Sequence, residues 1–342
     1  MKSTRRKFIQ GAATLISAPV ISSFSPVAII PQAKSSSPAE KITVALIGAR
    51  GRGYGVLRDA LKQKNVTCAA ICDIDDSVLR ERTTDVEKIQ GSVPQQFKDF
   101  RKLLERKDID AVIIGTPDHW HCLPMVYACQ SGKDVYVEKP LANSIAECAI
   151  MEKAARKYNR VVQVGMQQRS ADVWNHSKEY IKSGEIGRLR KVLVWANFNY
   201  GLGTKRVPDE PVPEGVDFDM WLGPAPKRNF NKGRFHGNWR MFWDYGGGLL
   251  TDWGVHLMDM ALWIKDIKEH PVAVQSSGGN WGSDEYMHET FDTLSVNYQM
   301  KDYLINWQNT AGTEQGPYGM PYGLAYICDK GTLVINRSGW EV

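Results

Sequence analysis

The chain has 342 residues and a formal net charge of +5. Four basic residues, Lys2, Arg5, Arg6 and Lys7, lie in the first 33 residues, which contain no acidic residue, so the charge of the remainder is only +1. Nucleic-acid binding is therefore not indicated, because it needs clustered positive charge on the folded part of the chain. The remainder is long enough for about two domains.

A leader with paired arginines precedes the first predicted strand. Residues 11–30 are apolar but interrupted by prolines, which disfavours the alternative of a membrane anchor, since a spanning helix needs about 20 apolar residues. The pattern Arg5-Arg6-Lys7-Phe8-Ile9 resembles twin-arginine signals, which export folded proteins across the bacterial inner membrane. We therefore expect residues 1–33 to be an export signal read by the twin-arginine machinery, residues 34–40 a linker, and the protein to be periplasmic or exported.

A glycine-rich loop separates the first strand, 41–47, from a helical stretch at 56–64, and a second strand follows at 66–72. This order is typical of a dinucleotide-binding fold, in which the loop approaches the pyrophosphate, although a flexible surface turn is the alternative. Arg50 replaces the middle glycine of G-x-G-x-x-G, so Gly51 would provide the close backbone approach instead. The expected cofactor-binding residues of the loop are Gly48, Arg50, Gly51, Arg52 and Gly53.

Asp73 ends the second predicted strand, roughly 25 residues after Gly48, where a dinucleotide fold places the carboxylate that binds the adenosine ribose. Its negative charge would repel a 2'-phosphate, and no arginine immediately follows it. The sequence therefore predicts NAD as the cofactor in preference to NADP.

Strands and helices continue to alternate up to residue 165. Strands are predicted at 111–115, 134–137 and 161–164, and helices at 77–90, 123–131 and 144–158. The fold class is therefore α/β, with a Rossmann-type, doubly wound parallel sheet over residues 41–165 as the NAD(P)-binding domain. Ligands of such sheets bind at the carboxyl ends of the strands. The further cofactor-binding residues expected at this edge are Thr116, Pro117, His121, Glu138 and Lys139.

The pattern changes beyond residue 165. A helix at 172–183 is followed by longer alternating runs, which predict antiparallel strands. We expect residues 166–342 to form a C-terminal α+β domain, for substrate binding and oligomerisation, with a large, mostly antiparallel open sheet. Within it, Gly246-Gly247-Gly248 opens a helix that carries Asp252 and His256, which are four residues apart and therefore share one helical face.

These motifs carry a family resemblance over nearly all of the mature chain. The glycine loop, Glu138-Lys139-Pro140 and the run Gly247-Gly248-Leu249-Leu250-Thr251-Asp252-Trp253-Gly254-Val255-His256 together strongly resemble the glucose-fructose oxidoreductase, inositol dehydrogenase and rhizopine-catabolism (Gfo/Idh/MocA) oxidoreductases. The resemblance implies hydride transfer on a sugar or polyol, with Lys139, Asp252 and His256 around the substrate hydroxyl beside the nicotinamide. It also implies a homo-oligomer paired through the open sheet, and relatives that often continue beyond Val342, so the C-terminus here is expected to be truncated.

Oxidation of a secondary alcohol needs a base at the hydroxyl and a positive group beside the developing alkoxide. We assign His256 as the base, Lys139 as the positive group and Asp252 as the residue that orients the imidazole or holds a neighbouring hydroxyl. Lys139 remains open as the proton carrier if burial lowers its pKa. Lys139-Pro140 is predicted to be a cis peptide bond.

Aromatic and basic side chains suggest a sugar site. His119, Arg169, Arg240, Trp243 and Tyr245 are the expected substrate-binding residues, although packing in the core is the alternative for each aromatic residue. No metal is expected, because the six cysteines have irregular spacing and Asp118 with His121 lacks a third ligand. The cysteines are expected to be small core residues.

Three functions are compatible with the sequence. The favoured one is an NAD-dependent oxidoreductase acting on a carbohydrate. The second is a glycoside hydrolase related to the NAD-dependent α-N-acetylgalactosaminidases, in which transient oxidation permits elimination. The third is a sugar sensor that only retains the cofactor fold. Free NAD is expected to be scarce outside the cytoplasm, so the export signal favours a tightly bound cofactor that is regenerated in place.

Overall fold

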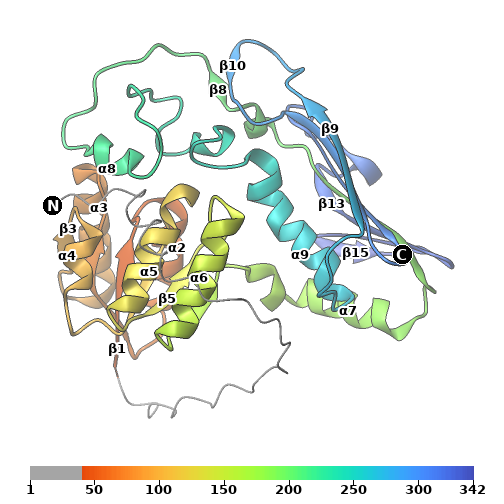
Figure 1. Cartoon of the computed structure of the whole chain (residues 1–342). Helices are drawn as coiled ribbons and strands as arrows, with labels where there is room; N and C mark the ends of the chain where they lie inside the picture. The colour runs from red at the N-terminus through yellow and green to blue at the C-terminus, as the bar shows by residue number, and fades with distance from the viewer. Residues whose placement is uncertain (1–40) are drawn as a thin grey trace, which may run out of the picture.

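The computed structural model describes residues 41–342, and the predicted export signal and linker lie outside the described residues. Two sheets dominate this part of the chain, a parallel sheet flanked by helices and a larger open sheet (Figure 1). The predicted α/β fold, with a doubly wound parallel sheet followed by a mostly antiparallel one, is confirmed.

The first sheet has six parallel strands in the order β3-β2-β1-β4-β5-β6. Apolar runs form its central strands, and most residues of β1, β2 and β4 are buried because helices cover both faces of such a sheet. The strands are β1 (Ile42–Ile47), β2 (Val66–Cys72), β3 (Gln95–Phe97), β4 (Ala111–Ile114), β5 (Asp134–Val137) and β6 (Val162–Val164).

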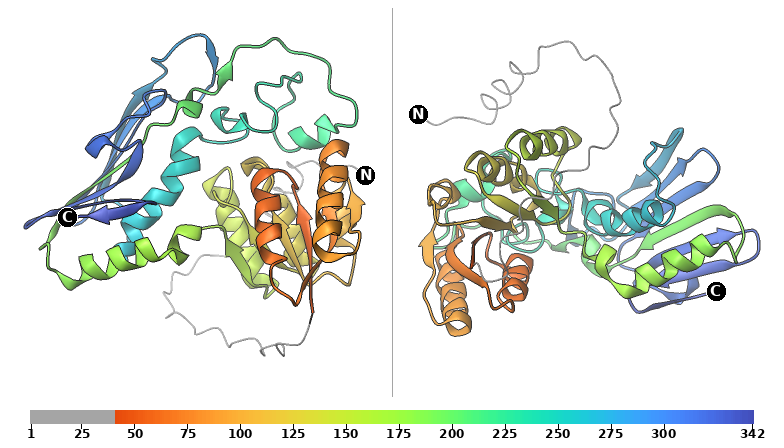
Figure 2. Two further views of the ribbon diagram at one scale, coloured as in Figure 1. Left: turned by 180° about the vertical axis from the view of Figure 1, so that it is seen from behind. Right: turned by 90° about the horizontal axis from the view of Figure 1, so that it is seen from below.

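Helices cover the two faces of this sheet (Figure 2). Several begin at a side chain that caps free backbone N–H groups: Asp75 accepts from Ser77 N at the start of α3, and Asp99 accepts from Arg101 N at the start of α4. The helices are α2 (Gly51–Ala60), α3 (Asp76–Gln90), α4 (Phe100–Leu104), α5 (Cys122–Gln130) and α6 (Ile145–Lys157), with the 3-10 turn η1 (Asp118–Trp120) before α5.

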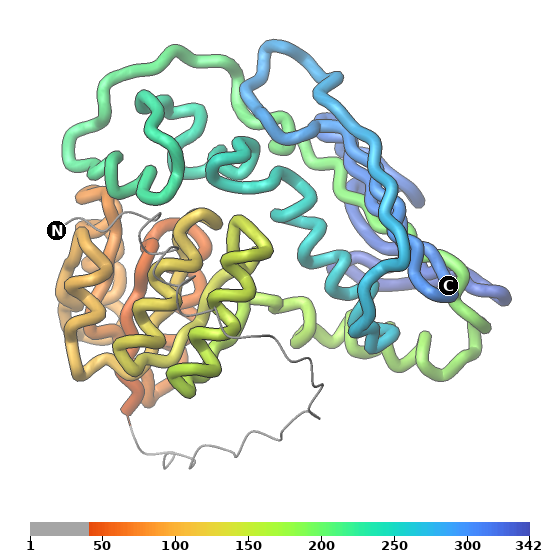
Figure 3. The backbone as a smooth tube through the Cα atoms, in the orientation of Figure 1, coloured from red at the N-terminus to blue at the C-terminus, as the bar shows by residue number. Residues whose placement is uncertain are grey.

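The second sheet has seven strands in the order β15-β14-β13-β7-β12-β11-β9, and only the pair β12 and β7 is parallel. Helices α7 (Asp172–Ser183) and α9 (Val255–Ile264) pack along one face over a core that includes Trp174, Trp307 and Tyr326 (Figure 3). The strands are β7 (Leu189–Ala196), β9 (Ala273–Gly279), β11 (Thr293–Gln299), β12 (Leu304–Thr310), β13 (Tyr322–Cys328), β14 (Thr332–Asn336) and β15 (Gly339–Glu341).

A long connection leaves the second sheet and returns to the first. Residues 206–238, called the crossing segment below, follow the short strand β8 (Thr204–Lys205) and contain helix α8 (Phe218–Leu222); β8 pairs with the distant strand β10 (Tyr286–Met287). Figures 1 and 2 show this segment lying over the end of the parallel sheet, beside α3. It makes backbone hydrogen bonds there, from Asp76 N to Gly215 O (3.1 Å) and from Asp217 N to Ile74 O (2.9 Å).

Four of the six cysteines are buried in the described part of the chain, as expected of core residues. Burial raises the pKa of the Cys68 thiol to about 12. None of the helices in residues 41–342 has the length and apolar character needed to cross a membrane.

Candidate active site

A cavity of about 680 Å³ opens at the carboxyl edge of the parallel sheet. One wall is the edge itself, with the glycine loop and the ends of β2, β4 and β5; the other walls are the crossing segment and the start of the α9 region. Its charged and titratable lining residues are Arg50, Arg52, Asp73, Lys98, Asp118, Glu138, Lys139, His236, Arg240, Asp252, His256 and Arg337.

Glycines bring the loop close to the neighbouring strand. Gly48 has φ +81°, and a Cβ there would lie 2.7 Å from Thr116 N, while a Cβ on Gly53 would overlap the Gly48 carbonyl oxygen. Gly51 differs, because its φ is +45° and nothing lies within 4 Å of the place of its Cβ. Gly51 also lines the cavity at the first turn of α2, where free backbone N–H groups favour phosphate. The loop therefore fits the pyrophosphate of a dinucleotide.

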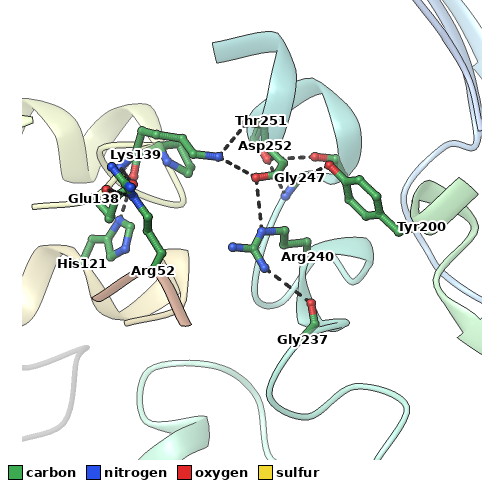
Figure 4. A network of polar contacts seen from close by, with 12 residues as sticks. Arg52, His121, Glu138, Lys139, Tyr200, Gly237, Arg240, Gly247, Thr251 and Asp252 are labelled. Atoms are coloured by element: carbon green, nitrogen blue, oxygen red, sulfur yellow. Dashed lines mark hydrogen bonds and ion pairs between the residues drawn. The ribbon is translucent and has the colours of Figure 1, made fainter. Parts of the chain in front are cut away.

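The two loop arginines have different partners. Arg52 Nε donates to Glu138 Oε1 at 2.8 Å, so the glycine loop is tied to the Glu-Lys-Pro motif (Figure 4). Arg50 precedes α2 directly and its side chain lines the cavity. Arg50 is thus the better placed of the two for a phosphate, and Arg52 positions Glu138.

Asp73 lies at the end of β2, as predicted. Its carboxylate accepts hydrogen bonds from Ala49 N (2.8 Å) and Asp75 N (3.2 Å), and it lines the cavity. Burial raises the pKa of Asp73, and the hydrogen bonds from these backbone groups oppose that effect. A carboxylate oriented by the glycine loop fits a ribose hydroxyl and disfavours an additional phosphate.

Lys139, Asp252, Arg240 and Tyr200 form one network (Figure 4). Lys139 Nζ lies 2.6 Å from Asp252 Oδ1 and 2.7 Å from the Asp252 carbonyl oxygen. Tyr200 donates to Asp252 Oδ2 at 2.7 Å, and Arg240 Nε lies 3.2 Å from Oδ1. Burial alone would raise the pKa of Asp252, but the charges of Lys139 and Arg240 outweigh it and lower the pKa to about 2. Asp252 is therefore a carboxylate that fixes two cations at one end of the cavity.

His256 is buried beside this network, with 3% of its surface exposed, and lines the same cavity. Its Nδ1 atom has no hydrogen-bond partner in the described residues. Burial first, and then the positive charges of Lys139 and Arg337, lower the pKa of His256 to about 3. The imidazole is therefore neutral at pH 7 and has a free ring nitrogen. Asp252 lies in a π-helical turn (Leu250–Gly254) that runs into α9, and both side chains face the cavity.

Two family models match the chain. "Oxidoreductase family, NAD-binding Rossmann fold" matches residues 42–166, and "Oxidoreductase family, C-terminal alpha/beta domain" matches residues 174–305. Together they cover most of the chain. The chain belongs to the Gfo/Idh/MocA oxidoreductase family.

The relatives of this Gfo/Idh/MocA protein differ in their activities. A "Glycosyl hydrolase family 109 protein" of Shewanella pealeana is 32% identical over 173 residues, which are 46% of this chain and 38% of the relative, so the chain spans well under half of that relative's length. The myo-inositol 2-dehydrogenase of Lactobacillus plantarum has a similar fold, with TM-score 0.64 at 19% identity over 88% of this chain and 82% of the other. A levoglucosan dehydrogenase whose structure was solved with NADH and levoglucosan also has a similar fold. Its TM-score is 0.65 at 19% identity, over 87% of this chain and 74% of the other.

Most of the predicted cofactor residues of this Gfo/Idh/MocA chain line the cavity, including Thr116 and Pro117, and the Lys139-Pro140 bond is cis, as predicted. His121 does not line it. Its ring nitrogens lie 2.7 Å from Pro140 O and 2.9 Å from Thr116 O, and burial lowers its pKa, so the neutral ring donates its single N–H to one of these two carbonyl oxygens. His121 is thus placed behind the cavity wall, between Thr116 and Pro140.

Of the predicted substrate-binding residues, only Arg240 lines the cavity. Arg169 forms an ion pair with Asp259 (2.6 Å), and Trp243 is 53% exposed on the surface. His119 and Tyr245 are buried and pack against each other, with His119 Nε2 3.0 Å from Trp221 O. These four residues therefore lie outside the lining of this cavity, and for Tyr245 the structure shows packing in the core, the alternative given for aromatic residues.

The sequence analysis missed several lining residues. Arg337 and His236 come from a hairpin turn and from the crossing segment, where no motif marks them, and Tyr200 reaches the site only through Asp252. Asp118 was considered only as a metal ligand, yet it is 4% exposed in the cavity wall. Burial raises the pKa of Asp118 well above its usual range, and the charge of Arg240 opposes this only in part. No group of three or more metal-binding side chains occurs between residues 41 and 342.

Proposed function

We propose that this protein is an exported, NAD-dependent oxidoreductase that transfers a hydride between a secondary hydroxyl of a sugar or polyol and a tightly bound nicotinamide cofactor. The observation that carries the proposal is the position of Lys139, Asp252 and His256 at one end of a cavity that begins at the glycine loop. The levoglucosan and myo-inositol dehydrogenases share this fold and support a carbohydrate substrate.

The chemistry follows from the charges at this end of the cavity. When bound, a nicotinamide cofactor supplies the hydride acceptor. Lys139, held by Asp252, places positive charge where a substrate oxygen becomes an alkoxide. His256 is neutral and its ring lines the cavity, so it is able to accept the hydroxyl proton. Asp252 is fully engaged with Lys139, Arg240 and Tyr200, and its role is to position them.

Tight binding of NAD is supported by the walls of the cavity. Asp73 opposes a 2'-phosphate, and the crossing segment lies over the edge at which the adenosine half would bind. The segment would therefore cover part of a bound cofactor and slow its release. The test is to purify the chain after expression in bacteria, release any nucleotide by denaturation, and identify it. NAD(H) at near one equivalent supports the proposal, and absence of nicotinamide binding even on addition contradicts it.

A second candidate is glycoside hydrolysis by transient oxidation and elimination. The match to a glycosyl hydrolase family 109 protein favours it, and so does Asp118, because burial raises the pKa of this carboxyl in the cavity wall and thereby favours the protonated form that donates a proton to a leaving oxygen. Incubation with sugars and with aryl glycosides separates the functions. Net nicotinamide reduction supports the oxidoreductase, and release of the aryl group without net reduction supports the hydrolase. If neither occurs but the protein still binds NAD and sugar, the sensor is supported.

Export and assembly are further parts of the proposal. Export rests on Arg5 and Arg6, so replacement of both by lysine is expected to leave the protein in the cytoplasm of a bacterium with a twin-arginine pathway, as measured by cell fractionation.

A homo-oligomer is proposed because the face of the large sheet opposite α7 and α9 has no covering α-helix in the described residues. Sedimentation analysis of the purified chain tests it.

A further inference from the structure

Arg337 places an additional positive charge at the catalytic end of the cavity. It lies in the turn between β14 and β15 and lines the cavity together with Lys139 and His256. Its charge is one of the causes that lower the pKa of His256. None of the acidic residues between 41 and 342 forms an ion pair with Arg337, whereas Arg52, Lys139 and Arg240 all have such partners.

The position of Arg337 is fixed by neutral groups. Its Nε donates to Gln168 Oε1 at 2.9 Å, and Gln168 is buried and donates from Nε2 to the backbone oxygen of His256 at 3.2 Å. The guanidinium also stacks on the Trp253 ring, 4.5 Å from its centroid. These contacts tie Arg337 to the base His256 and hold its plane, while its two terminal nitrogens have no hydrogen-bond partner in the described residues.

The charges at this end do not balance. Lys139 and Arg240 share the single carboxylate of Asp252, and Arg52 is neutralised by Glu138. Burial disfavours the charged form of Asp118 and raises its pKa well above the usual range, so this carboxyl is a weak counter-ion. Arg337 therefore adds to an excess of positive charge beside the reacting hydroxyl. An arginine without a counter-ion in a binding cavity favours an anionic ligand, and the pair of terminal N–H groups matches a carboxylate.

We propose that Arg337 binds a carboxylate on the substrate, so that the sugar oxidised at this site is an acidic one such as a hexuronate. The inference rests on the proposed function, since it names the substrate class of the same site. The other source of the same chemistry is the pyrophosphate of the cofactor, and the experiment distinguishes the two.

The experiment measures binding by calorimetry to the full-length, NAD-loaded protein and needs no turnover. The probes are D-glucuronate and D-galacturonate, their neutral counterparts D-glucose and D-galactose, and D-glucose 6-phosphate. We expect a uronate to bind more tightly than its neutral counterpart. We expect Arg337→Met, which keeps a long apolar stem over Trp253, to weaken uronate binding roughly 10- to 100-fold. Arg337→Lys should retain part of the affinity, and Arg156→Met, on the exposed face of α6, should change nothing.

Four results would overturn the inference. The first is that neutral sugars bind as tightly as uronates and that Arg337→Met has no effect on binding. The second is that Arg337→Met loses as much affinity for NAD as for the uronate, which would assign Arg337 to the cofactor. The third is a preference for the phosphorylated sugar, and the fourth is that no sugar binds at all. The proposed function fails separately. The proposed function fails if the protein binds no nicotinamide, or if no sugar leads to nicotinamide reduction. In the second case, a uronate that binds through Arg337 without turnover would still support the inference about Arg337.

Discussion

Asp252 is the residue on which the catalytic end of the cavity depends. It accepts hydrogen bonds from Lys139 and Tyr200 and forms an ion pair with Arg240, and its own side chain is buried. In such a site a positive charge is held without reorganisation, which is the condition for strong electrostatic stabilisation of an alkoxide. Burial is the first cause of the lowered pKa of His256, and the charge of Lys139, which Asp252 holds, adds to it.

Replacement of Lys139 by methionine tests this arrangement at a single residue. Lys139→Met removes the charge but keeps the length of the side chain, so we expect kcat for sugar-dependent NAD reduction to fall about 10²- to 10³-fold. NAD affinity should be unchanged, because Asp73 and the glycine loop remain. Steady-state kinetics and nucleotide titration check this. Lys62→Met, at the exposed end of α2, is the control. A variant at Lys139 with the kcat of the wild type would show that the lysine is remote from the reacting oxygen.

At the scale of elements, the cavity depends on how closely α2 approaches β1 and β4. A Cβ on Gly53 would overlap the Gly48 carbonyl oxygen, whereas Gly55, one turn of α2 away from the loop, has nothing within 4 Å of the place of its Cβ. We expect Gly53→Ala to destabilise the protein and abolish NAD binding, since backbone atoms cannot give way. Gly55→Ala should leave binding intact and stabilise α2 by up to about 1 kcal/mol.

Thermal unfolding and NAD titration of these two variants provide the comparison. Because both changes replace a glycine of the same helix by alanine, a difference between them reports the contact with Gly48 rather than helix propensity. Tight NAD binding by Gly53→Ala would contradict the packing described here.

The crossing segment is the second element that the cavity needs. His236 Nε2 lies 2.9 Å from Asp75 Oδ2, and this contact joins the segment to the start of α3. His236 has φ +59°, a conformation that asparagine tolerates better than most residues, so His236→Asn removes the contact without imposing backbone strain. A lost hydrogen bond of about 1 kcal/mol predicts release of bound nucleotide roughly fivefold faster.

The release rate is measured by loading the protein with NADH and following fluorescence after addition of excess NAD. His176→Asn, on the exposed side of α7, is the matched control and should release nucleotide at the wild-type rate. An unchanged rate in His236→Asn would mean that the segment is held in place by its backbone hydrogen bonds alone.

At the scale of the whole molecule, the parallel sheet and the convergence of Lys139, Asp252 and His256 on one cavity could be predicted because their signals are local. A strand followed by glycines places Gly48 and Asp73, and the spacing of Asp252 and His256 brings both to one side of a helix start. The walls could not be predicted in this way. His236 and Arg337 reach the cavity from residues far away in the sequence, and nothing in the local pattern separates them from surface residues. Aromatic residues such as Tyr245 were misplaced because packing and sugar binding use the same side chains.

The buried histidine also affects the stability of the whole molecule. The pKa of His256 falls from 6.5 to about 3 on folding, so below pH 6.5 the unfolded chain binds a proton that the folded protein does not. Stability should therefore fall as the pH drops from 6.5 towards 3, by up to about 1.4 kcal/mol per pH unit from this residue. Asp252 affects stability only at lower pH. Its pKa is 3.8 in the unfolded chain and about 2 in the folded protein, so its stabilising contribution is lost only as the pH falls below 3.8.

Urea unfolding between pH 6.5 and 4.5 measures this slope in the wild type and in His256→Gln, whose amide does not titrate. His121 and His236 also have lowered pKa values and contribute to the slope of both proteins, so the difference between the two proteins isolates His256. We expect the slope to be shallower in His256→Gln and unchanged in His176→Gln. Equal slopes in all three would mean that His256 takes up its proton as readily in the folded as in the unfolded chain. The neutral base required by the proposed reaction would then be absent at low pH.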